Sequence, residues 1–247
     1  MGARGNGSRV GSRRVAWVLC TLLGALGSAA QAGDPVTDAM VQAYVPYRQA
    51  LFQTNAQSQA ESGAALTRAR TAWAQLTQRF GGQPTLPYER DAGFAQDLKA
   101  VDGLYAAAAE QVARGQLPEA HETLEQVRDV LAALRQRNGV IVYSDHMNAY
   151  HAAMEHLLTE GKALVGQRDG WAPLAEQVGV LDFLAQRLQS EATAELRADP
   201  AFGPALQAVL DSVAQLRTAV RAQQADAALA AIAKVKAPYS KLFLRFG

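Results

Sequence analysis

The amino-acid sequence predicts an all-α protein built as two tandem up-down four-helix bundles that arose by internal duplication. The composition is 49% hydrophobic but only 7% aromatic, so the core must be built from Ala, Leu and Val, which favours helices over sheets. Apolar residues recur at spacings of three and four, which is typical of packed helices. The same pattern returns in the second half of the chain, and no alternating strand pattern accompanies it.

The segment 1–32 is expected to be an export signal rather than part of the fold. A basic stretch precedes a short apolar stretch over residues 15–26, and a small-x-small cleavage site follows at residues 30–32. The apolar stretch is too short to span a bilayer as a helix. The basic residues are Arg4, Arg9, Arg13 and Arg14. The prediction is therefore a cleaved signal peptide over 1–32 and a periplasmic or secreted protein without a stable membrane anchor.

Two export routes stay open for this signal. Arg13 and Arg14 resemble the pair of a twin-arginine signal, but Ala16 stands where a large apolar residue is usual. The general secretory route accommodates the same residues. Leu19 precedes the single cysteine, Cys20, where a lipoprotein signal needs a small residue, so lipid attachment is not expected.

Cleavage would change the charge and remove the cysteine. Four arginines and no acidic residue leave with the signal, so 20 basic and 23 acidic residues remain and the net charge changes from +1 to −3. A chain without cysteine has no disulfide, no thiolate metal site and no covalently attached c-type haem. The weak net charge gives no electrostatic reason to expect nucleic acid as a partner.

The first helix of each unit is predicted from an apolar seam that starts at Val36 in one copy and at Tyr143 in the other. Asp34 and Pro35 are a suitable N-cap and first helical residue. Pro46 is expected to kink the helix or to mark where its straight part begins. The seams are Val36, Met40, Ala43, Tyr47 and Ala50 in the first unit and Tyr143, Met147, Tyr150, Met154 and Leu157 in the second.

For the other three helices, one constant shift in residue number, the offset, relates the two units, and it takes Leu66 to Leu174. This offset is one position larger than the one that relates the two first helices. The second seam is Leu66, Ala69, Trp73, Leu76 and Phe80, repeated as Leu174, Gln177, Leu181, Leu184 and Leu188. The third is Phe94, Leu98, Val101, Tyr105, Ala108 and Val112, repeated as Phe202, Leu206, Val209, Val213, Leu216 and Val220. The fourth is Ala120, Leu124, Val127, Leu131 and Leu134, repeated as Ala228, Ile232, Val235, Tyr239 and Leu242. Arg137 and Gly139 match Arg245 and Gly247 at the same offset.

Glycine- and proline-rich stretches separate these helices and define two units, 33–139 and 140–247. Pro238 is expected to kink the last helix. Phe243 and Leu244 lie off the last seam, so they are expected to pack on the other unit or to present a binding surface.

One stretch of the second unit carries candidate metal ligands. His151 and Glu155 are four positions apart and share a helical face, and His146 lies earlier on the same predicted helix. Met147 and Met154, on the adjoining seam, would add soft ligands. Such a set would suit copper, zinc or haem, and none of these positions carries a histidine in the first unit.

An equally good interpretation places these residues at the edge of an ordinary core. The three histidines recur at every fifth position, so each is rotated by roughly 140° from the last, and they converge only if other helices contribute. The methionines would then fill the core. His121 and Glu125 repeat the His-x-x-x-Glu spacing on the fourth helix, where a solvated face is expected.

The predicted architecture resembles exported four-helix bundle proteins such as cytochrome b562 and cytochrome c′. The ligands depart from both families. Cytochrome c′ attaches its haem through CxxCH, which this sequence lacks. Cytochrome b562 uses a Met on its first helix and a His on its last. Met40 or Met147 could stand for the former, but neither predicted fourth helix has a suitably placed histidine. The resemblance therefore concerns the fold and not the function.

The function predicted first is a non-enzymatic periplasmic binding or scaffolding module with a periplasmic protein as a candidate partner. The alternative is a metal- or haem-binding protein in metal handling or electron transfer. Phosphate-binding loops, dinucleotide turns, zinc-protease motifs and nucleophile elbows do not occur in the sequence, so catalysis ranks third.

Overall fold

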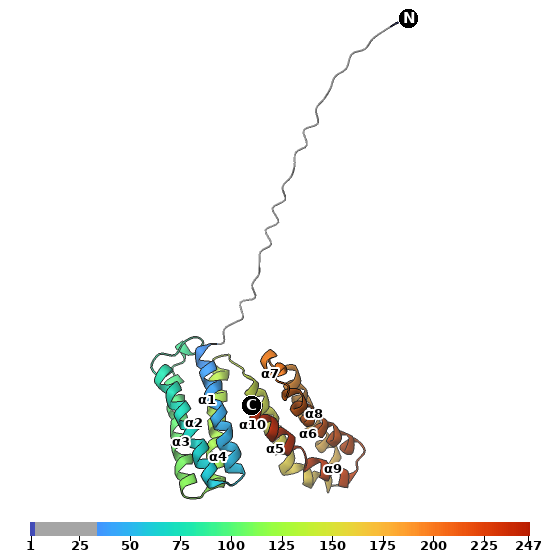
Figure 1. Cartoon of the computed structure of the whole chain (residues 1–247). Coiled ribbons are helices and arrows are strands. Elements are labelled where there is room, and N and C mark those ends of the chain that lie inside the picture. Colours follow the sequence, from blue (N-terminus) through green and yellow to red (C-terminus); the bar gives the residue numbers. More distant parts are fainter. Residues whose placement is uncertain (3–33) are drawn as a thin grey trace. The chain divides into compact units, whose positions relative to one another are not determined.

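A computed structural model of the chain describes residues 1–2 and 34–247 (Figure 1). The predicted signal peptide therefore falls outside the described residues, apart from its first two. Residues Gly33–Gly247 belong to one compact unit. Within the described ranges the regular structure is helical and no strand occurs, which confirms the all-α class. No helix in this part of the chain is long and apolar enough to cross a bilayer.

The first half consists of four long helices, each packed against two of the others. They are α1 (Pro35–Asn55), α2 (Gln59–Phe80), α3 (Phe94–Ala113) and α4 (Leu117–Arg137), with a short 3₁₀ turn at Tyr88–Arg90. Helix α1 packs against α2 and α4, and α3 packs against the same two helices. Asp34 caps α1 as predicted, because its carboxylate accepts from the backbone N–H groups of Val36 and Thr37 at 3.1 and 2.8 Å.

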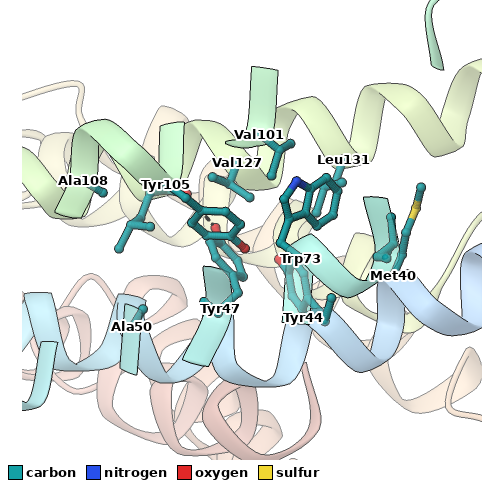
Figure 2. Packing of buried hydrophobic residues seen from close by; sticks show 14 of the residues in the cluster. Met40, Tyr44, Tyr47, Ala50, Trp73, Val101, Tyr105, Ala108, Val127 and Leu131 are labelled. Atoms are coloured by element: carbon teal, nitrogen blue, oxygen red, sulfur yellow. Dashed lines mark hydrogen bonds between the residues drawn. The ribbon is translucent and has the colours of Figure 1, made fainter. Parts of the chain in front are cut away.

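The core of this half is built from the predicted seams, and two of its aromatic residues, Trp73 and Tyr47, have polar groups that donate to backbone carbonyls of other helices (Figure 2). The indole of Trp73 is 1% exposed, and its N–H donates to the carbonyl of Leu98 at 3.2 Å. The hydroxyl of Tyr47 donates to the carbonyl of Leu124 at 2.8 Å. Because each of these buried donors has a fixed acceptor, the rings hold the helices in register.

The second half repeats this packing with a more interrupted chain. It contains α5 (Tyr143–Val165), α6 (Trp171–Ser190), a short α7 (Ala194–Ala198), α8 (Phe202–Arg221), α9 (Ala225–Ile232) and α10 (Lys236–Phe246). Helix α6 contacts both α5 and α8. Helices α9 and α10 also contact both α5 and α8, and α7 lies against α8. Its residues form a second core cluster, and Phe243 packs against both clusters.

The seam of α6 differs from the prediction at two positions. Val178 and Ala185 are buried, at 1% and 0% exposure, whereas Gln177 and Leu184 are only half-buried. Leu174, Leu181 and Leu188 are buried as predicted. A residue three or four positions after a buried leucine can face the same core, so strict transfer of the first unit's seam selected the wrong neighbour twice.

The two prolines inside predicted helices behave differently. Helix α1 continues through Pro46. The last predicted helix is broken instead into α9 and α10, with non-helical residues 233–235 between them. Pro238 lies in the first turn of α10, so its ring would clash with the carbonyl of Lys234 in a continuous helix. The expected kink is therefore a complete break, although the predicted seam stays buried on both sides of it.

Local details also recur at the offset that relates the seams. Arg137 pairs with Asp91 at 2.7 Å, and Arg245 pairs with Asp199 at 3.3 Å. At the ends of α3 and α8, Gly115 and Gln223 both have a positive φ, of 75° and 52°. The residue after each of them donates a backbone hydrogen bond to the carbonyl five positions earlier, at 2.9 Å after α3 and 3.1 Å after α8.

Candidate functional site

A pocket of about 400 Å³ lies where α1, α4, α5 and α10 meet, and we refer to it as the His121 pocket. Its volume is within the range of small-molecule sites. Helices α1 and α10 contribute most of the apolar lining, and α4 and α5 contribute most of the charged and imidazole groups. The lining residues are Leu51, Phe52, Asn55, His121, Glu122, Glu125, Arg128, His151, Glu155, Lys236, Tyr239, Ser240, Phe243 and Leu244.

Helical spacing brings these side chains into the pocket. On α4, His121, Glu125 and Arg128 follow one another at spacings of four and three, so they share one face next to the buried seam. His151 and Glu155 do the same on α5. The break before α10 gives that helix its own start at Lys236, which lines the pocket as well.

A chain of polar contacts crosses from α4 to α5 and α10. Arg128 Nη1 donates to His151 Nδ1 at 2.9 Å. An arginine can only donate, so Nδ1 of His151 accepts and its ring proton lies on Nε2. This Nε2 faces Oε1 of Glu155 at 3.4 Å, and Lys236 Nζ approaches the same oxygen at 3.0 Å. The His151 ring, with Lys236 and against the opposing effect of burial, lowers the pKa of Glu155 to about 2.

The ring proton of His121 lies on Nδ1, whereas that of His151 lies on Nε2. Its Nδ1 lies 3.2 Å from the carbonyl oxygen of Leu51 and 3.1 Å from the hydroxyl of Thr54. The carbonyl can only accept, so Nδ1 donates and Nε2 carries the lone pair. Nε2 faces Oε1 of Glu125 at 3.8 Å. Burial lowers the pKa of His121 despite this carboxylate, so the ring is neutral near pH 7.

The predicted metal ligands are divided among three places. His151 and Glu155 line the His121 pocket together. His146 is separated from them, and its nearest acid is Glu191, with Nε2 and Oε2 4.0 Å apart. Met147 and Met154 are 0% exposed in the second core cluster. Among residues 34–247, no three side chains of His, Cys, Asp or Glu lie close enough to hold one ion.

The part of the pocket that comes from other helices was not predicted from the sequence. His121 and Glu125 were expected on a solvated face, but their side chains are only 27% and 32% exposed. Arg128 and Lys236 were not singled out. The repeated His-x-x-x-Glu spacing on α4 and α5 was the available signal, but only the fold shows that the two pairs line one pocket.

A buried ion pair joins the last turn of α4 to the first turn of α5. The guanidinium of Arg135 is 3% exposed and binds the carboxylate of Asp145 through two hydrogen bonds. Oδ2 of Asp145 also accepts from the backbone N–H of Val142 at 3.0 Å. The partner of Asp145 comes from the other half of the chain, so no spacing within α5 indicates this pair.

Comparison with known proteins found no match: no family model matches the chain, and no curated protein or solved structure matches it. The proposed function therefore depends on the residues of the pocket.

Proposed function

We propose that this chain is an exported, non-enzymatic binding protein made of two tandem four-helix bundles that arose by duplication. The signal over 1–32 would be removed, and the units 33–139 and 140–247 would act together in the periplasm or outside the cell. The His121 pocket, between the two units, would be the ligand site. A periplasmic protein that delivers or receives the ligand would be its partner.

The repeated local structure supports the duplication. An ion pair, a positive-φ helix end and the buried seams of the third and fourth predicted helices recur at one offset, although the side chains involved differ in part. Gly115 and Gln223 end their helices with a positive φ at matching places, although Gln57 ends α1 in a similar conformation. A shared ancestor would explain why the two units turn in the same way at this place.

The observation that carries the binding function is the composition of the pocket. A ligand site typically combines an apolar lining with a few converging polar groups, and the His121 pocket has both in a suitable volume. Its polar groups are fixed by contacts to neighbouring helices, so the pocket is organised before a ligand arrives.

A ligand screen tests this function. The exported protein and a Ser240→Trp variant, whose indole fills the pocket, would be compared in thermal-shift and calorimetric titrations against small organic cations, anions and neutral compounds. We expect at least one class to stabilise the unaltered protein and not the variant. If every compound affects both proteins equally, the pocket is not a binding site and the proposed function is wrong.

Metal or haem binding is the second candidate, since two His–Glu pairs line the pocket. An ion between His151 Nε2 and Glu155 Oε1 would replace the ring proton and compete with Lys236, which lies 3.0 Å from the same oxygen. Titration with copper, zinc and haem separates the candidates. Stoichiometric, tight binding that is lost in His151→Ala would favour a metal protein over the first proposal.

A further inference from the structure

The lining of the His121 pocket includes two hydrogen-bond acceptors that lie close to each other. Nε2 of His121 carries a lone pair because Nδ1 is bound to the Leu51 carbonyl, and Oε1 of Glu125 lies 3.8 Å away. The same oxygen has only a long contact to Arg128, at 3.5 Å. A carboxylate can accept several hydrogen bonds, so a donor that reaches both atoms would bind to each of them.

The charges of the pocket favour a cation over an anion. Lys236 is paired with Glu155, and Arg128 donates to His151, so an anionic ligand would have to compete with contacts that exist already. Glu122 adds a third carboxylate to the lining, against two basic side chains. Among its acidic and basic side chains, the lining therefore carries one more negative than positive charge.

The apolar part of the lining indicates what kind of group the cation is attached to. Phe52 is 40% exposed although it lines the pocket, and Phe243 and Leu244 line it from α10. An apolar ligand body would cover this surface and remove it from water, which is favourable by roughly 25 cal/mol per Å². An inorganic cation would leave this surface exposed.

We propose that the His121 pocket binds a small organic amine, with the protonated amino group between His121 Nε2 and Glu125 Oε1 and an apolar body against Phe52, Phe243 and Leu244. This inference rests on the proposed binding function and names its ligand class. Arg128 and His151 act as positioning residues for the polar groups of the lining.

Calorimetric titration of the exported protein with 4-phenylbutylamine tests the proposal, with 4-phenylbutanol and 4-phenylbutanoate as matched neutral and anionic compounds. We expect one-to-one binding of the amine at pH 7.5 that is at least about tenfold tighter than that of either relative, as one charge-assisted hydrogen bond implies. Glu125→Gln should reduce amine affinity to that of the alcohol. Glu119→Gln, an exposed acid of α4 outside the pocket, should leave it unchanged.

Three results would each overturn the proposal: equal affinities for the three compounds, no binding of the amine, or an amine affinity that Glu125→Gln leaves unchanged. The comparison among compounds needs no variant, so it stays decisive even if a substitution destabilises the fold. If another class of compound binds and this binding is lost in Ser240→Trp, the ligand is not an amine, but the proposed binding function still holds.

Discussion

Single residues connect the two halves of the chain through buried charge. The Arg135–Asp145 pair has little exposed surface on the arginine, and it lies where α4 passes to α5. Breaking a buried pair from one side is costly because the remaining charge stays desolvated. This pair therefore fixes the start of α5, and with it the position of His151 on the same helix.

Asp145→Asn tests this role. We expect the free energy of unfolding to fall by about 3 kcal/mol in urea denaturation, because Arg135 keeps its charge and loses its counter-ion. Glu110→Gln is the control, since the Arg114–Glu110 pair is 62% and 70% exposed and should contribute less than about 1 kcal/mol. Similar losses in both variants would show that the buried pair has no special role.

The lowered pKa of Glu155 predicts that the stability of the fold depends on pH. Its pKa is about 2 in the folded protein, below its ordinary value of 4.5, so its stabilising contacts are fully present above about pH 5. They are lost as the pH falls through 4.5 toward 2, because the unfolded chain takes up the proton first. The stability difference between the unaltered protein and Glu155→Gln should therefore narrow from pH 5 to pH 3. A difference that stays constant over this range would contradict the assigned contacts.

At the scale of the helices, the repeated turn after α3 and α8 gives a paired prediction. Gly115→Ala should cost about 1 kcal/mol, because alanine disfavours a positive φ although its Cβ would meet only Gln59, at 3.8 Å. Gln223→Gly, at the matching position, should stabilise the protein by about 0.5–1 kcal/mol. Thermal and urea unfolding measure the change in stability of each variant. If both substitutions shifted stability in the same direction, the two helix ends would not be equivalent.

The helices were predictable from sequence because a single periodicity decides them. The seams from Leu66 to Phe80 and from Phe94 to Val112 are buried as expected, since any helix with such a stripe must cover it. The pocket was not predictable in the same way. His121, His151 and Lys236 are distant in sequence and meet only because α4, α5 and α10 pack together, which no local spacing encodes.

For the whole molecule, two core clusters share one compact unit, and the His121 pocket lies between helices of both. Phe243 packs against both cores, and its ring lies 6.4 Å from that of Tyr44 on α1. Helices of both halves line the pocket, and His151, Glu155 and Lys236, all from the second half, supply part of its polar lining.

The most direct test of this account is a crystal structure of the exported protein grown with 4-phenylbutylamine. We expect the amino group within hydrogen-bond distance of both His121 Nε2 and Glu125 Oε1, with the phenyl ring against Phe243. A structure with the amine bound elsewhere and the His121 pocket empty would contradict it.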